Sequence, residues 1–264
     1  TVFKKKISKE EDMVISKKQL LLTNNGEIVL SKNLKDKNIF WWNGTTYKPI
    51  RVIDVKDSKV NLHKFITSQG RIINCPFNTN FLGNPNSSWV NYSKFKDLSI
   101  QSVPGASKKT TVAVLGYLKI FGDSWKNKLD IDCLKSSFYL FQNKRPNPYT
   151  KLNITLALSK LAESDLKYVL KPFLSEKIIK HLTSFSKDFL IMLLSRLGVA
   201  ANGHSDHCPL TEPGTIRFKG SLTKPLKYEN LRYAGKINEP AIKIRTEFPT
   251  DNLLIGSFIC QTPS

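Results

Sequence analysis

The stretch Val112–Trp125, VAVLGYLKIFGDSW, decides how the rest of this 264-residue sequence is interpreted. It begins with β-branched and apolar residues, carries Gly116 inside an apolar run of helical length, and reaches a polar turn at Gly122. A glycine inside a helix destabilises it unless another element packs very closely against it. We therefore expect a central, closely packed helix over residues 112–122.

Upstream of this stretch, short apolar runs alternate with turn signals. Asn25–Gly26 and Asn43–Gly44 are typical hairpin turns because Asn-Gly readily adopts positive φ. Many short strands separated by regular turns indicate an all-β unit. The segment QSVPGASKKTT at 101–111 ends this pattern with Pro-Gly and a polar cluster, so we place a boundary there.

Composition limits the class of protein. The net charge is +20 with a pI near 9.8, which suits a nucleic-acid backbone or an acidic partner, or else a Lys-rich solvated surface. The four cysteines form no CxxC pair, which predicts an intracellular, reducing compartment and no disulfide framework. No apolar run is long enough to predict a membrane span. The Lys and Asn content is typical of an organelle or phage genome.

The β unit resembles a Hint domain, the self-splicing fold of inteins and hedgehog autoprocessing domains. LLLTNNGEI at 20–28 and GRIINCPF at 70–77 carry this resemblance in the first part of the chain. It implies a splicing nucleophile at Val14 by position, with Ser16 as the nearby hydroxyl. It also implies that Asn74 and Phe77 stand where inteins have the Thr and His that polarise the scissile peptide.

The end of the chain resembles the last intein blocks over AIKIRTEFPTDNLLIGSFICQT at 241–262. The resemblance puts Cys260 at the penultimate His and Gln261 at the terminal Asn, whose side-chain amide cyclises to release the C-terminal exon. Thr262 would be the residue that follows the intein. A glutamine can cyclise through a larger ring, and without the His we expect little or no cleavage.

The stretch at 112–125 is similar to the first LAGLIDADG helix of an intein homing endonuclease. The residues that fit are Leu115, Gly116, Tyr117, Gly122, Ser124 and Trp125. The resemblance implies that Phe121 replaces the metal-binding Asp. Asp123 comes one residue late, about 100° around a helix, and Glu163 is a weak second acid candidate. The segment 182–201 resembles a strand and helix that support the DNA-binding sheet; in a rival register, residues 189–198 form the second LAGLIDADG helix.

Two further groups of residues were considered as sites. His204, His207 and Cys208 are too cramped for zinc and have no fourth ligand nearby, so no metal site is predicted. Basic and apolar residues alternate over 215–233, which could turn basic side chains toward phosphates or leave a solvated edge. The nucleic-acid-binding candidates there are Arg217, Lys219, Lys224 and Lys227.

The predicted fold class is α+β: an all-β Hint-like domain built from both chain ends, with an inserted α/β LAGLIDADG-like domain. We expect a flank at 1–13, Hint-like parts at 14–105 and 241–262, the insert at 106–240, and host sequence at 263–264. The predicted function is an intein-derived insertion that has lost splicing and DNA cleavage. It would be joined covalently to a host polypeptide on both sides, with DNA or RNA as a further partner of its basic face.

Two alternatives remain open at this point. One is an active enzyme, either a LAGLIDADG endonuclease using Asp123 and Glu163 or a splicing intein using Ser16 and Gln261. The other is a nucleic-acid-binding module that keeps the fold for its surface. No cofactor is expected, except Mg²⁺ if the endonuclease is active.

Overall fold

The structure, a computed structural model, describes residues 12–83, 89–91, 110–121, 156–175, 178–179, 184–204 and 215–261. The strands in the first part of the chain are β1 (Met13–Ser16), β2 (Leu20–Leu22), β3 (Ile28–Leu30), β4 (Asn38–Trp42), β5 (Tyr47–Ser58), β6 (Leu62–Thr67), β7 (Ile72–Cys75), β8 (Asn80–Leu82), β9 (Trp89–Asn91) and β10 (Thr110–Leu115). Those in the second part are β11 (Ile178–Ile179), β12 (Val199–His204), β13 (Thr215–Ser221), β14 (Leu226–Ile237), β15 (Ala241–Thr246), β16 (Leu253–Ile255) and β17 (Phe258–Gln261). The helical elements are η1 (Ser31–Asn33), η2 (Leu156–Lys160), α3 (Glu163–Ser175) and α4 (Ser184–Arg196).

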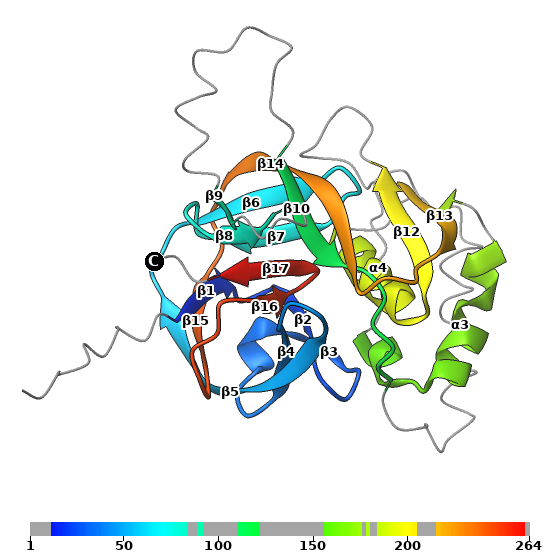
Figure 1. Cartoon of the computed structure of the whole chain (residues 1–264), viewed down its shortest axis with the longest axis horizontal. Helices are drawn as coiled ribbons and strands as arrows, with labels where there is room; N and C mark the ends of the chain where they lie inside the picture. The colour runs from blue at the N-terminus through cyan, green and yellow to red at the C-terminus, as the bar shows by residue number, and fades with distance from the viewer. Residues whose placement is uncertain are drawn as a thin grey trace, which may run out of the picture.

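Most of these strands belong to one antiparallel sheet of twelve strands, with the order β1-β15-β5-β4-β16-β17-β10-β14-β6-β7; in addition, β8 pairs with β17, and β9 pairs with β8. Its first and last strands, β1 and β7, contact each other although no ladder joins them. The sheet is therefore nearly closed and barrel-like. Strands from the two chain ends are interleaved in it (Figure 1). The N-terminal strand β1 pairs with β15 from the C-terminal part, and the C-terminal strand β17 lies between β16 and β10.

Residues 110–115 form strand β10 and residues 116–121 are irregular, so the predicted helix over 112–122 is wrong. Val112 and Val114 pack into one core cluster, whereas Ala113 and Leu115 pack into the other. A strand buried on both faces is apolar at every position, and its periodicity cannot be distinguished from that of a short buried helix. The β-branched residues Thr110, Thr111, Val112 and Val114 favour the strand.

Gly116 is closely packed, as predicted, but it does not lie in a helix. A Cβ at this position would lie 2.3 Å from the Lys224 carbonyl oxygen. The neighbouring backbone groups hydrogen-bond across the same contact, Gly116 N to Pro225 O at 2.9 Å and Tyr117 N to Lys224 O at 2.7 Å. The glycine therefore lets residues 116–117 lie against the loop before β14.

The molecule is mostly β, and the described residues do not form an inserted α/β endonuclease domain. Two α-helices occur in the described ranges, and the helix expected within 182–201 is confirmed as α4, which packs beside β12. Both lie on one side of the main sheet with the sheet β11-β13-β12 (Figure 1). The domain boundaries at 105/106 and 240/241 remain predictions, although β10 and β14, which lie between them, pair with strands outside them.

Candidate functional site at the seam of the sheet

The edges of β1 and β7 meet at a seam that side chains, not a backbone ladder, hold together. The Glu239 Oε2 accepts hydrogen bonds from Ser16 Oγ at 2.7 Å and from Asn74 Nδ2 at 3.1 Å. The Asn74 backbone N–H donates to Gln19 Oε1 at 3.3 Å. Two positions predicted as splicing residues, Ser16 and Asn74, are thus brought together, and the residue that links them was missed by the sequence analysis.

Ser16 is fixed on every side. Its side chain is fully buried, and its Oγ accepts from Lys18 N at 3.1 Å while donating to the Glu239 carboxylate. Its carbonyl oxygen accepts from Ser31 Oγ at 2.6 Å. A carboxylate next to a hydroxyl can act as a base, but burial leaves no room for a separate substrate. Val14, the positional candidate for the nucleophile, has only an apolar side chain in a small cluster with Leu62 and Ala241.

Phe77 belongs to an aromatic cluster. Its ring centroid lies 5.1 Å from that of His63 and 5.3 Å from that of Tyr233. The Nδ1 atom of His63 lies 3.0 Å from the Tyr233 hydroxyl. The imidazole of His63 therefore lies beside Phe77. The two residues are separated in the sequence, so the sequence did not indicate this contact. The cross-strand pairing of His63 with Cys75 brings it there.

The thiols of Cys75 and Cys260 are buried in the same core cluster. Burial raises the pKa of Cys260 well above its usual value, and Cys75 raises it further. Burial also raises the pKa of Cys75 to about 12, despite a hydrogen bond with Thr79. Both thiols stay protonated at neutral pH, so neither is a good nucleophile.

Gln261 is held in a row of side-chain amides across β17, β8 and β9. Asn80 Nδ2 donates to Gln261 Oε1 at 3.2 Å, and Asn91 Nδ2 donates to Asn80 Oδ1 at 2.8 Å. These residues are direct cross-strand neighbours, which keeps their amides side by side. Thr262 lies outside the described residues.

The nuclease candidates are only partly described. Phe121 lies in the irregular segment 116–121, with the Arg196 guanidinium 4.9 Å from its ring centroid. Glu163 begins α3 and forms ion pairs with Lys167 at 2.6 Å and Lys119 at 3.4 Å. These contacts, the one with Lys167 above all, hold the pKa of Glu163 below its usual value. Asp123 lies outside the described residues.

The predicted phosphate and zinc residues are only partly described. Lys224 is exposed, and Lys227 Nζ lies 3.4 Å from the Glu229 carboxylate. The structure describes only the backbone of Arg217, Lys219 and His204. His207 and Cys208 lie outside the described residues. Within the described ranges, no three His, Cys, Asp or Glu side chains come close enough together to bind a metal ion. No described helix is long and apolar enough to cross a membrane.

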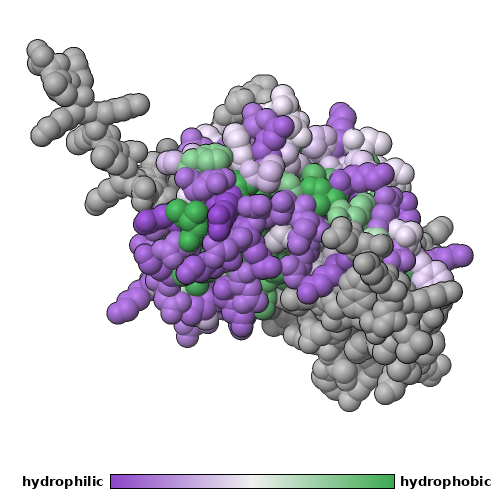
Figure 2. Space-filling view, turned by 90° about the horizontal axis from the view of Figure 1, so that it is seen from below, coloured by the Kyte–Doolittle hydropathy of each residue, from purple (hydrophilic) through white to green (hydrophobic). Residues whose placement is uncertain are grey.

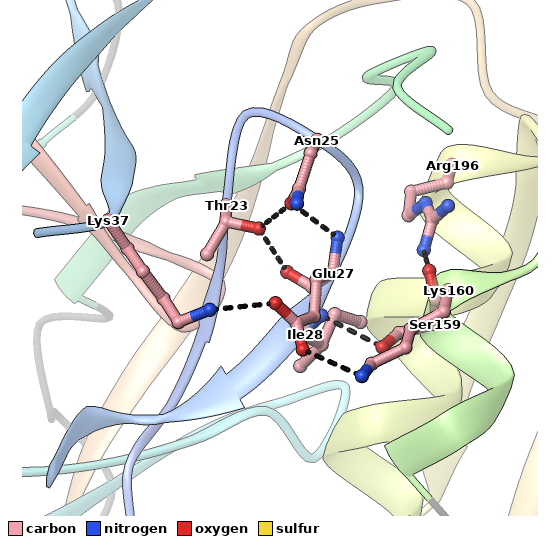
Figure 3. Close-up of polar contacts among 8 residues, drawn as sticks. All are labelled: Thr23, Asn25, Glu27, Ile28, Lys37, Ser159, Lys160 and Arg196. Carbon is pink, nitrogen blue, oxygen red and sulfur yellow. Dashed lines mark hydrogen bonds and ion pairs between the residues drawn. The ribbon is translucent and has the colours of Figure 1, made fainter. Parts of the chain in front are cut away.

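A second polar network attaches η2 and α4 to the turn between β2 and β3 (Figure 3). The fully buried Arg196 donates from Nη1 to Gly26 O at 2.6 Å and to Ser159 O at 2.9 Å. Ile28 N donates to Ser159 Oγ at 2.9 Å. Burial lowers the pKa of Arg196 to about 10, so it remains a cation at neutral pH and bonds to carbonyl oxygens.

Glu27 is the charged residue of that turn. Its carboxylate lies 2.9 Å from Lys37 Nζ and 3.4 Å from Lys160 Nζ. Burial by itself raises the pKa of Glu27, but the two ammonium groups outweigh it and hold the pKa below its usual value. The turn is therefore fixed by charge as well as by hydrogen bonds.

Comparison with known proteins gives only structural likeness. No family model matches the chain, and no curated protein sequence matches it. Among solved structures it is similar to the G-1F mutant of the Ssp DnaB mini-intein variant M86, at 13% identity and a TM-score of 0.41 over 95% of this chain and 98% of that one. The same variant without that mutation gives 13% identity and 0.40 over 96% and 97%.

The DnaX mini-intein of Spirulina platensis is also similar, at 9% identity and a TM-score of 0.37 over 93% of this chain and 98% of that one. All three of these structures are mini-inteins. At these TM-scores the likeness supports no conclusion about chemistry. Conclusions about chemistry come from the residues of the seam.

Proposed function

We propose that this chain is an intein-derived insertion that has lost protein splicing and DNA cleavage and remains in its host polypeptide as an extra domain. The intein-like blocks follow one another in the expected order, and strands from both chain ends alternate in one nearly closed sheet. The observation that carries the proposal is that the candidate splicing residues are not free to react. Each side chain that would have to react is buried, apolar or held by hydrogen bonds.

The first splicing step needs a nucleophile free to attack its own backbone carbonyl. Ser16 is the hydroxyl at this end of the sheet, and it is buried between Glu239 and Lys18 N. Phe77 cannot exchange a proton, and its ring is packed against other aromatic rings. An attack by Ser16 therefore lacks a mobile nucleophile, and the side chain at position 77 supplies no proton to the leaving amine.

The last splicing step needs a side-chain amide that can fold back on its own carbonyl carbon. The amide of Gln261 is fixed toward Asn80 instead. The neighbouring Cys260 thiol is buried and protonated, so it supplies neither an imidazole nor a thiolate. Cyclisation would have to break the amide row and proceed without acid or base help.

Loss of DNA cleavage is supported by the position of the carboxylates. Residues 110–115, which include the start of the stretch that resembled a metal-binding helix, form strand β10, and Glu163 is neutralised by two lysines. Cleavage by this class of enzyme needs two acids that share divalent cations. The residues that the structure describes contain no group of three or more His, Cys, Asp or Glu side chains that could hold a metal ion.

The test places the chain, with its own flanks, between two reporter proteins of different mass. We expect one covalently continuous polypeptide and no ligated reporter pair. As a matched gain-of-function control, Cys260→His combined with Gln261→Asn should yield the reporter released at the C-terminal junction. Ligated reporters from the unmodified chain would show that splicing survives, and nicking of DNA that depends on Mg²⁺ would show that the nuclease survives.

A nucleic-acid-binding module is the second candidate, favoured by the net charge of +20. The face on the β5 side is largely hydrophilic (Figure 2). Lys48 in β5 and Lys59 directly after it are exposed and form no ion pair among the described residues. Binding to phosphates would weaken steeply as salt rises, and affinity independent of salt would exclude this candidate.

A further inference from the structure

The chain contains the dipeptide Asn-Gly twice, at the turn between β2 and β3 and at the turn between β4 and β5. Gly26 and Gly44 both have positive φ, 83° and 102°. In such a dipeptide the glycine nitrogen follows directly on the asparagine, and no Cβ hinders its approach to the side-chain carbonyl carbon. The two turns differ in the exposure and the hydrogen bonding of the glycine.

The turn at Asn43 leaves the reacting atoms accessible. Asn43 and Gly44 are both exposed, and Gly44 N donates to no backbone carbonyl among the described residues. The Asn43 Oδ1 accepts three hydrogen bonds, from Thr45 N at 3.0 Å, Thr45 Oγ1 at 3.0 Å and Thr46 N at 2.9 Å. These donors polarise the amide carbonyl and face the oxygen that would become negative on attack, as in an oxyanion hole.

The turn at Asn25 holds the same dipeptide in place. Gly26 is buried, its N–H donates to Thr23 O at 3.0 Å, and its carbonyl oxygen accepts from Arg196 at 2.6 Å. The Asn25 Oδ1 is also bound, by the Thr23 hydroxyl and by Glu27 N (Figure 3). The attacking nitrogen is therefore shielded from solvent base, and the turn is pinned on both sides.

We propose that Asn43 is a site of spontaneous deamidation in the folded protein, and that Asn25 is protected although it has the same neighbour. The Gly44 nitrogen loses its proton to a solvent base and forms a bond to the Asn43 side-chain carbonyl carbon. The Nδ2 group takes up a proton and leaves as ammonia. Water then opens the cyclic imide to aspartate or isoaspartate.

This modification is independent of splicing and of the proposed function. An aspartate at 43 keeps the oxygen that accepts the three hydrogen bonds, so the turn survives that product. Isoaspartate lengthens the backbone by one carbon and disrupts the pairing of Trp42 with Tyr47 beside the turn. The site would thus convert a stable hairpin into a mixture of intact and altered chains as the protein ages.

The test incubates the folded full chain at mildly alkaline pH in ¹⁸O-labelled water and follows both turns by peptide mapping. We expect Asn43 to convert at least about tenfold faster than Asn25, because only its nitrogen is free and its oxygen is met by three donors. In denaturant the two rates should converge, since the dipeptide is the same. Thr45→Val removes one donor and should slow Asn43 a few-fold without changing Asn25.

Three results would overturn the proposal. They are equal rates in the folded protein, faster conversion at Asn25, or cleavage of the chain after Asn43, which would mean that the side-chain nitrogen attacks instead. Arg196→Lys provides the reciprocal test, because it loosens the turn at Gly26 and should raise only the Asn25 rate. Should that variant not fold, Thr23→Val removes the hydroxyl that contacts both Asn25 Oδ1 and the Glu27 carbonyl oxygen, and so loosens the same turn.

Discussion

Glu239 lies where the first and last strands of the main sheet meet, and its Oε2 accepts hydrogen bonds from both sides of that seam. Glu239→Ala would leave the buried Ser16 hydroxyl and the Asn74 amide without their acceptor. We expect a loss of about 1–3 kcal/mol in the free energy of unfolding, the cost of unsatisfied buried polar groups. Urea unfolding measures this loss, and amide exchange should become faster in β1.

Asp57 offers a matched control for that change. Its side chain is exposed and forms an ion pair at 2.6 Å with Lys17, the residue that follows β1. Exposed pairs contribute about 0–1 kcal/mol, so Asp57→Ala should leave the exchange rate of β1 nearly unchanged. Equal effects of the two substitutions would mean that the seam is not what closes the sheet.

The buried thiols give a second prediction at the residue scale. Because burial raises the pKa of both Cys75 and Cys260, neither forms a thiolate at neutral pH, and neither is accessible. An alkylating reagent should leave both unmodified in the native protein and label both in denaturant. Rapid labelling of either thiol under native conditions, read by peptide mass, would contradict the burial of this core.

At the scale of elements, β10 shows where sequence reasoning reaches its limit. The turns at Asn25–Gly26 and Asn43–Gly44 were predicted because the dipeptide itself favours the backbone conformation of a tight turn. The strand over Thr110–Leu115 was not, because its burial depends on β14 and β17, which come more than a hundred residues later in the chain. Gly116 correctly signalled a close approach, but the sequence could not say that the neighbour was a loop.

Gly116→Ala tests this close approach. The new Cβ would lie 2.3 Å from the Lys224 carbonyl oxygen, a backbone atom that cannot rotate away. The loop before β14 must therefore shift, at a cost of about 1–3 kcal/mol, as for other overpacked sites. Thermal unfolding measures the cost. Gly44→Ala is the comparison, since no atom lies within 4 Å of its Cβ and only the φ of 102° opposes it. A neutral Gly116→Ala would show that the contact is loose.

At the scale of the whole molecule, the sequence indicates the β character and the participation of both chain ends, but not the seam. Ser16 and Asn74 were selected by resemblance, and the carboxylate between them has no local signature, because it lies after β14 in an ordinary loop. The same holds for Arg196, whose three carbonyl acceptors come from three separate segments. Contacts of this kind exist only once the chain has folded.

The stability of the whole molecule should fall at acid pH, because buried or paired carboxylates keep their charge in the folded state. Burial by itself raises the pKa of Glu229. Its contacts with Arg71 at 3.1 Å, Thr67 and Lys227 outweigh burial, so the pKa is lowered. The pKa of Glu27 is lowered in the same way, by its two lysines. A lowered folded pKa gives stability that is complete above the unfolded value of 4.5 and is lost as the pH falls through the folded values.

Glu229→Gln tests this linkage directly. It leaves Arg71 buried without its partner, so the variant should be less stable than the parent at neutral pH, and the two stabilities should approach each other as the pH falls below about 4. Urea midpoints across this range measure the difference. Glu163→Gln is the control: its pKa is also lowered, but its side chain is 32% exposed and salt screens its ion pairs. A constant gap between Glu229→Gln and the parent at all pH values would show that the Arg71 pair does not govern acid unfolding.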